Sequence, residues 1–172
     1  YNDEAILARC LDAVGFADEV VVVVDAKTTD GSEKLAREMG ARVLVRRYVG
    51  DVEQKRYLQS LAECRWVLLL DSDEVVSPEL SAEICDFLRR SGDDQNVAGA
   101  EVNRLTFHLG RWIRHGDFYP DWKLRLFRRG GTGEGRVVGR NPHGRIDVAG
   151  KVVQLAGDLE HYSYRDLSDQ VT

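Results

Sequence analysis

A cluster of acidic residues directly follows an unbroken apolar stretch near the middle of the chain. The apolar residues 67–70 are followed by Asp71, Ser72, Asp73 and Glu74. Two carboxylates separated by one residue can face a single cation, and Mg²⁺ or Mn²⁺ prefers such oxygen ligands together with phosphate oxygens. The same residues also suit an ordinary turn followed by a helix start. Because clustered carboxylates repel one another unless a cation joins them, the pattern favours a divalent metal site for a phosphate-containing ligand.

The acidic cluster lies within an alternation of predicted strands and helices in residues 1–90. Apolar or β-branched runs typical of strands buried on both faces occur at 19–25, 41–47 and 65–71. Apolar residues at helical spacing predict helices at 2–14, 31–40 and 51–64, and another that begins after Ser77. The first strand also ends in an acid, Asp25. Ligands of open parallel sheets bind at the carboxyl ends of the strands, so Asp25 and the acidic cluster are expected at one edge.

The pattern changes after a polar linker at 90–97. Strands and turns are predicted in the second half, within 98–107, 122–129, 144–155 and 158–164. The fold class is therefore α/β and Rossmann-like, with a mostly parallel sheet in the N-terminal half and a mixed or antiparallel C-terminal half. We expect a single domain over residues 1–172. The helix that begins at Asn2 has a good N-cap and an acidic first turn, and it leads us to expect one more strand upstream of it.

Composition and charge restrict the class of protein. The 172-residue chain has 43% hydrophobic and 31% charged residues, and its net charge of −5 gives no general attraction for nucleic acid. Residues 104–145 are locally basic, with ten Arg or Lys against three Asp or Glu, which indicates a solvated face or a surface for an anionic substrate or membrane. Three widely spaced cysteines predict buried free thiols, and no apolar run suits a membrane span. We therefore expect a cytoplasmic protein.

Five motifs, taken in order, resemble one family of enzymes. They are "YNDE" (1–4), "VVVVDAKTTDGS" (21–32), "VLLLDSDEVVSPEL" (67–80), "GRWIRHGDFYPDWKLRLFRRG" (110–130) and "HYSYRDL" (161–167). Together they resemble the family 2 glycosyltransferases, which have the GT-A fold, and within that family the bacterial lipopolysaccharide core β-glucosyltransferases. The resemblance implies a UDP-sugar donor, a divalent cation as cofactor, and a glycan or lipid-linked acceptor.

The resemblance assigns two groups of residues to the donor and the metal. Asp25 would hydrogen-bond the nucleotide base, and the residues expected to line the same pocket are Tyr1, Asn2 and Glu4. Asp71 would lie near the ribose and the metal. The 1–90 half would thus bind the nucleotide-sugar, and the 97–172 half the acceptor.

The remaining assignments concern the cation and a neighbouring lysine. By the resemblance, Asp73 would ligate the Mg²⁺ or Mn²⁺ that bridges the two phosphates, and His161 would complete the metal shell, with His143 as a rival. Lys55 falls where related enzymes often carry a lysine near the nucleotide, and an exposed helix lysine is an equally good interpretation of it.

The implied chemistry is the transfer of a hexose, expected to be glucose, with inversion. An acceptor hydroxyl attacks the anomeric carbon while a carboxylate removes its proton, and the metal stabilises the departing diphosphate. Family position favours Asp121 as this base, with Asp117 as the alternative. The Arg-rich segment 111–129 suits an anionic lipopolysaccharide-core acceptor, or a peripheral contact with the inner face of the plasma membrane.

Two other functions remain open at the level of sequence. A sugar nucleotidyltransferase also uses acids and Mg²⁺ on an α/β sheet, but it predicts a Gly-rich basic loop after the first strand, which the start of this chain does not resemble. A truncated domain that binds a nucleotide without turnover is the second alternative, because it would follow if the expected upstream strand were missing.

Overall fold

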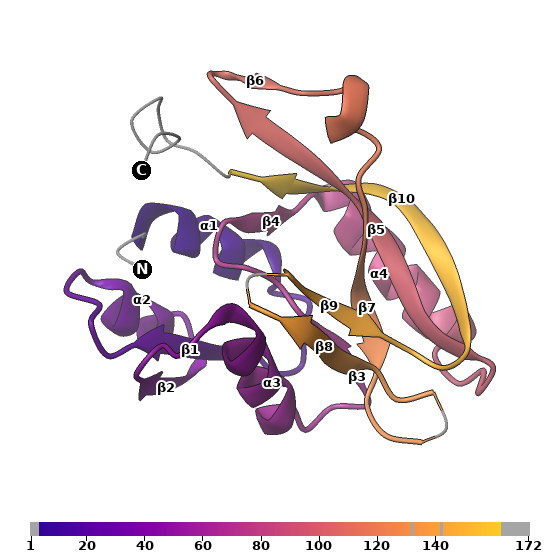
Figure 1. Ribbon diagram of the computed structural model, residues 1–172, viewed down its shortest axis with the longest axis horizontal. Helices are drawn as coiled ribbons and strands as arrows, with labels where there is room; N and C mark the ends of the chain where they lie inside the picture. Colours follow the sequence, from indigo (N-terminus) through magenta and orange to yellow (C-terminus); the bar gives the residue numbers. More distant parts are fainter. Residues whose placement is uncertain (1–3, 132, 142, 163–172) are drawn as a thin grey trace.

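The structure of the protein is a computed structural model that describes residues 4–131, 133–141 and 143–162 (Figure 1). The helices are α1 (Glu4–Ala13), α2 (Ser32–Glu38), α3 (Asp51–Leu61), α4 (Pro78–Ser91) and a short 3₁₀ helix, η1 (Gly116–Phe118). The strands are β1 (Val21–Asp25), β2 (Arg42–Arg46), β3 (Trp66–Leu68), β4 (Glu74–Val76), β5 (Val97–His108), β6 (Arg111–Trp112), β7 (Trp122–Arg128), β8 (Arg136–Arg140), β9 (His143–Asp147) and β10 (Lys151–His161). The alternation predicted for residues 1–90 is confirmed, with a short additional strand, β4.

The described strands form three sheets. β1 and β2 pair in parallel, and β8 and β9 form an antiparallel hairpin. The largest sheet has the order β3-β7-β5-β10-β4 and is mixed, since β5 and β10 are parallel while their other neighbours are antiparallel; β6 pairs with β5. β3 joins this sheet through β7 and does not extend the β1–β2 pair. The parallel part of the N-terminal half is therefore two strands wide in the described residues.

A cavity of about 580 Å³ separates β1 from β3. Apolar side chains of α1 and of both strands line it, among them Leu7, Leu11, Val22 and Val67. β1 pairs with β2 and β3 pairs with β7, and no described strand pairs with both β1 and β3. The strand expected upstream of α1 stays a prediction.

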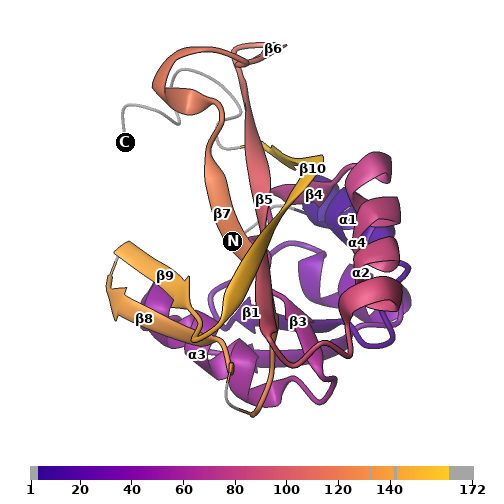
Figure 2. The same ribbon diagram turned by 90° about the vertical axis from the view of Figure 1, so that its right-hand side faces the viewer.

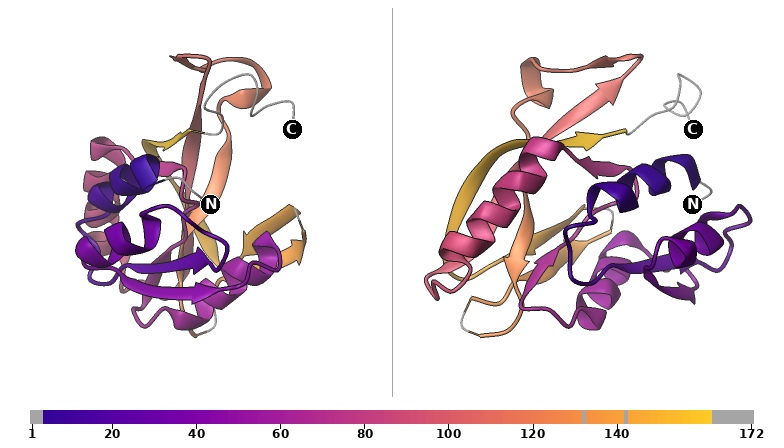
Figure 3. Two further views of the ribbon diagram at one scale, coloured as in Figure 1. Left: turned by 90° about the vertical axis from the view of Figure 1, so that its left-hand side faces the viewer. Right: turned by 180° about the vertical axis from the view of Figure 1, so that it is seen from behind.

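Helices cover both sides of the sheets (Figures 2 and 3). α1 and α4 lie on one side, and α3 lies on the other side beside the β8–β9 hairpin. The predicted start of α4 is confirmed, because Ser77 Oγ accepts a hydrogen bond from the backbone N–H of Leu80 at 3.1 Å and Pro78 follows the cap. Leu80 and Ile84 then pack in the main core with Leu159 of β10. This core fixes the sheet that carries the acidic residues.

A projecting arm, residues 107–119, extends from the body and contains the end of β5, β6 and η1 (Figure 1). Phe107 and Trp112 support it with an edge-to-face contact at 5.0 Å between ring centroids. Leu109 and Phe118, near its two turns, are 53% and 63% exposed. No helix in the described part of the chain is long and apolar enough to cross a membrane.

Candidate active site

The acidic cluster forms a tight loop between β3 and β4, which we call the acid loop (residues 71–74). The backbone N–H of Glu74 donates to the carbonyl of Asp71 at 3.0 Å, and the N–H of Asp71 donates to Glu74 Oε2 at 3.1 Å. The loop is thus closed on itself by one backbone bond and one side-chain bond. Both join its first residue to its last.

Asp71 is paired with two cations from different elements. Lys55 Nζ of α3 lies 2.7 Å from Asp71 Oδ1, and Arg125 Nη2 of β7 lies 3.3 Å from Oδ2. Burial acts to raise the pKa of Asp71, but Lys55 and Arg125 outweigh it and hold that pKa below its ordinary value. The structure therefore brings together Lys55 and Asp71, two residues expected near the donor. Their roles toward a nucleotide stay predictions.

Glu74 and Arg125 form a buried, two-pronged ion pair. Arg125 Nε lies 2.9 Å from Glu74 Oε2 and Nη2 lies 2.5 Å from Oε1, and the Glu74 side chain has no exposed surface. Burial acts to lower the pKa of Arg125, but the charges of Glu74 and Asp71 raise it. The expectation that Arg125 belongs to a basic surface is wrong, because its side chain is mostly buried and pairs with Glu74 and Asp71. Only the long-range pairing of β3 with β7 reveals this contact.

Asp73 faces His161, which lies at the end of the neighbouring strand, β10. The antiparallel register of β10 with β4 places His161 opposite Glu74, and His161 Nε2 lies 3.4 Å from Asp73 Oδ2. The backbone N–H of Tyr162 donates to the carbonyl of Asp73 at 2.9 Å. The two residues expected to hold the cation are thus neighbours. The side chain of the rival, His143, lies outside the described part of the chain.

The ligand atoms that Asp73 and His161 offer indicate what kind of metal site they could form. Among the described residues, no group of three or more His, Cys, Asp or Glu side chains is arranged to hold a metal. Mg²⁺, however, is commonly bound by one or two carboxylates with substrate phosphates and water as its other ligands. His161 Nδ1 is buried and has no hydrogen-bond partner among the described residues. Asp73 and His161 fit a cation that a diphosphate helps to bind, and they do not fit a closed all-protein site.

Two of the residues expected near the nucleotide base, Asp25 and Glu4, make contacts around the end of β1. Asp25 Oδ1 accepts hydrogen bonds from the backbone N–H groups of Lys27, at 3.2 Å, and Tyr48, at 3.1 Å, and so ties the end of β1 to that of β2. Glu4 Oε2 accepts from the N–H of Gly31 at 3.2 Å. The N-terminus of α1 is therefore anchored to the loop after β1, and the role of Glu4 toward a nucleotide stays a prediction. Two further candidates, Tyr1 and Asn2, lie outside the described residues.

Asp121, the predicted base, is held by two cations at the start of β7. Arg104 Nη2 lies 2.8 Å from Asp121 Oδ2, and Lys123 Nζ lies 2.8 Å from Oδ1. The side chains of Arg104 and Asp121 are partly buried, 25% and 24% exposed. Burial acts to raise the pKa of Asp121, but Lys123 and Arg104 hold it below its ordinary value. The alternative base, Asp117, lies exposed in η1.

A comparison with known families decides what kind of protein carries this arrangement. The model of the family described as Glycosyl transferase family 2 matches residues 1–149. The chain belongs to glycosyltransferase family 2. The GT-A fold inferred from the motifs is thereby confirmed. Members of this family generally use nucleotide-sugar donors and glycan acceptors.

Three relatives are similar to the glycosyltransferase over most of its length. An uncharacterized glycosyltransferase of Rickettsia typhi is 30% identical over 169 residues, covering 94% of this chain and 57% of its own. One from Rickettsia felis is 29% identical over 178 residues, covering 99% and 62%. The lipopolysaccharide core biosynthesis glycosyltransferase LpsC of Rhizobium meliloti is 25% identical over 177 residues, covering 99% and 63%. The chain thus spans less than two thirds of the length of these relatives.

One polar group of the glycosyltransferase was not predicted from sequence. Asp158 of β10 accepts hydrogen bonds from Asn103 Nδ2 at 3.2 Å and Tyr119 OH at 3.1 Å, and it pairs with Arg114 at 3.2 Å. Asn103 in turn accepts from the backbone N–H of Asp121 at 2.8 Å through its Oδ1. Asp158 and Asn103 therefore fix the segment that carries the predicted base. An isolated Asp within a strand pattern gives no sequence signal of such contacts.

Proposed function

We propose that this glycosyltransferase moves a hexose, glucose, from a UDP-sugar to a lipopolysaccharide-core or other lipid-linked sugar, with inversion at the anomeric carbon. The observation that carries the proposal is the acid loop, where Asp73 faces His161 while Asp71 is already paired with Lys55 and Arg125. The acceptor class is supported by the name of the Rhizobium meliloti relative, a lipopolysaccharide core biosynthesis glycosyltransferase. Family membership favours glycosyl transfer over nucleotidyl transfer.

The donor would lie along the carboxyl ends of β1 and β3. Asp25 offers a carboxylate to the base, and Glu4 shapes the same edge by holding the loop after β1. Lys55 pairs with Asp71 beside the acid loop, where its ammonium would also donate a hydrogen bond to the diphosphate. Asp73 and His161 would hold Mg²⁺ or Mn²⁺. When bound, the cation stabilises the negative charge that develops on the departing nucleoside diphosphate.

The proton of the attacking hydroxyl would pass to Asp121. Its carboxylate is ionised at neutral pH because Arg104 and Lys123 favour the charged form. The same two cations weaken it as a base, since a catalytic base works best with a pKa near the working pH. Asn103 and Asp158 keep the Asp121 segment in place against β5 and β10. We therefore assign Asp121 both proton removal and, through its partners, the orientation of the acceptor.

The projecting arm would place the enzyme against the inner face of the plasma membrane. Its exposed Leu109 and Phe118 can enter the lipid interface, and the exposed Arg111 and Arg114 can attract anionic headgroups. Such a contact would bring the arm close to a lipid-linked acceptor. On this proposal the domain works in the cytoplasm as a peripheral protein.

The test is isothermal titration of UDP, with and without Mn²⁺, into the wild-type chain, the Asp73→Ala variant and a control, Asp93→Ala. Asp93 is an exposed acid outside the acid loop. Loss of a cation ligand should weaken Mn²⁺-dependent UDP binding at least about tenfold, while the control binds normally. Unchanged binding in Asp73→Ala would refute the assignment. Release of UDP from UDP-glucose, with an inverted product by NMR, then tests transfer; binding without turnover would support the nucleotide-binding alternative.

A further inference from the structure

The Glu74–Arg125 pair connects the two halves of the candidate site. Arg125 lies on β7, two residues after Lys123 and four after Asp121, at the point where the register with β5 shifts and leaves Arg125 without a partner on β5. Lys123 contacts Asp121 at the beginning of β7, and Arg125 contacts the acid loop further along. β7 therefore contacts the predicted base, Asp121, near its beginning and the acid loop further along.

The ion pairs around Arg125 also make the acid loop independent of a metal. Asp71, Glu74, Lys55 and Arg125 together are formally neutral, and each acid contacts at least one of the two cations. Glu74 Oε2 accepts from both Arg125 Nε and the backbone N–H of Asp71, so the same carboxylate oxygen joins β7 to the first residue of the loop. Asp73 stands outside this group and keeps its carboxylate directed at His161.

We propose that Glu74 and Arg125 are a positioning pair for the transfer reaction, which holds the acid loop in one conformation and sets its place relative to Asp121. Neither residue touches the donor or the acceptor in this role; they act through Asp71 and Asp73. The effect on catalysis rests on the proposed function, whereas the effect on the loop does not. A two-pronged Arg–carboxylate pair suits this task because its geometry is fixed in direction as well as in distance.

A purely structural role makes a different prediction. Replacing a buried ion pair by apolar side chains of similar volume is often neutral or stabilising, because the desolvation of both charges no longer has to be offset. If the pair were purely structural, its replacement would change the stability of the protein and leave UDP binding unchanged. A positioning pair could not, because Leu at position 74 offers no acceptor to the Asp71 N–H and Met at position 125 offers no donor to the loop.

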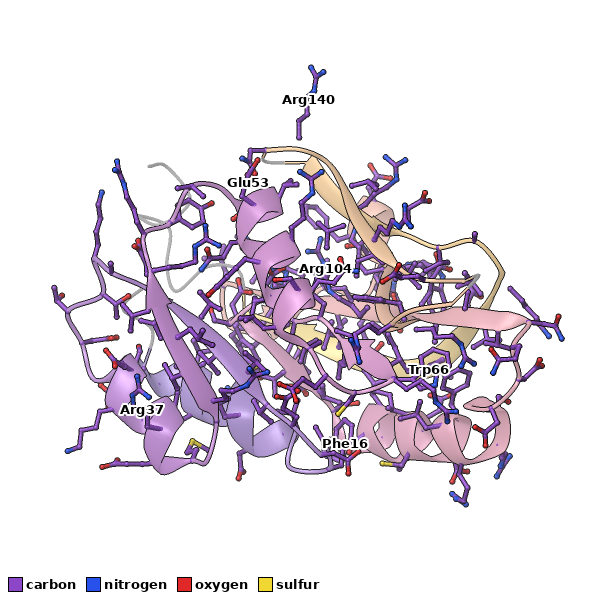
Figure 4. All side chains as sticks on the ribbon, turned by 90° about the horizontal axis from the view of Figure 1, so that it is seen from below. Phe16, Arg37, Glu53, Trp66, Arg104 and Arg140 are labelled. Atoms are coloured by element: carbon purple, nitrogen blue, oxygen red, sulfur yellow. The ribbon has the colours of Figure 1, made fainter. Side chains whose placement is uncertain are left out.

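The experiment compares wild type with the double variant Glu74→Leu/Arg125→Met. The control is Glu33→Leu/Arg37→Met, the same exchange in an exposed ion pair on α2, where Arg37 lies at the periphery of the molecule (Figure 4). We expect a melting temperature no lower than that of wild type, with hydrogen exchange of the Asp71 amide at least about tenfold faster, since a hydrogen bond to a charged group is lost. Mn²⁺-dependent UDP affinity should fall about tenfold or more. The control should change neither.

A second variant covers the case in which the double variant does not fold. Arg125→Lys keeps the buried charge but cannot form the two-pronged contact, so faster exchange in the acid loop is again expected. Unchanged exchange of the loop amides in either folded variant would overturn the proposal. If wild type itself fails to bind UDP with Mn²⁺, the proposed function fails, and the exchange data still decide whether Glu74 and Arg125 hold the loop.

Discussion

Replacing Lys123 by Met should lower the free energy of unfolding in a pH-dependent way, because it removes one of the two cations that pair with Asp121. The ammonium lies 2.8 Å from Asp121 Oδ1, and the two side chains are 36% and 24% exposed. For a pair this open to solvent, screening limits the contribution to about 0.5–1 kcal/mol at neutral pH. Because the pKa of Asp121 is lower in the folded state than in the unfolded chain, this stabilisation is present above the ordinary pKa of an aspartate and is lost as the pH falls through the lower folded-state value.

Urea unfolding of wild type and Lys123→Met, at pH 7 and at successively lower pH, measures this difference directly. The control is Lys34→Met, which removes an exposed helix lysine paired with Glu38. We expect a difference at pH 7 that shrinks as Asp121 becomes protonated, and a higher pKa of Asp121 in the variant by carboxyl ¹³C NMR. An Asp121 pKa equal to that of wild type would refute the account of how Lys123 acts. In transfer assays, the acidic limb of kcat/KM should move toward neutral pH in the variant.

Three further predictions concern the metal, the thiols and the arm. Treatment with EDTA should abolish UDP binding yet leave the melting temperature unchanged, because Lys55 and Arg125 already pair with Asp71 and Glu74; a large drop measured by calorimetry would contradict this. Alkylation followed by mass spectrometry should modify the exposed Cys85 and spare Cys10, because burial and the nearby acid loop raise the pKa of Cys10 to about 12; early labelling of Cys10 would oppose that explanation. Replacing Phe118 by Ser should lower sedimentation with anionic vesicles about tenfold, while equal binding by both proteins would exclude the arm as the contact.

Much of the α/β framework could be predicted from sequence because its signals are local. Ser77 and Pro78 specify the start of α4 through a cap and a missing N–H, and continuous apolar runs mark β1 and β3. The expectation of three buried thiols is confirmed for Cys10 alone; Cys64 is half-buried and Cys85 is exposed on α4. Helical periodicity indicates that a segment is a helix, but a single thiol on it can lie on either face.

The parts of the site that sequence did not predict depend on contacts between distant segments. Arg125 and Glu74 are 51 residues apart, and their contact follows from the antiparallel pairing of β3 with β7. Seen in sequence, Arg125 is one of several arginines in a basic segment, and Glu74 suits a solvated helix start. Asp158 likewise meets Asn103 only because β10 lies beside β5. Charge in a sequence does not say which charges cancel.

That cancellation gives the three acids of the cluster different roles. Glu74 and Asp71 lie against Arg125 and Lys55, so a further cation would gain little from their charges and would compete with partners already in place. Asp73 has His161 as its partner among the described ion pairs, and in that part of the chain no Lys or Arg side chain pairs with it. On the proposed function, a divalent cation would therefore gain most at Asp73, the acid of the cluster that pairs with no Lys or Arg among the described residues. The rigidity of that loop, rather than the number of acids in it, would then determine how well a diphosphate and a cation bind together.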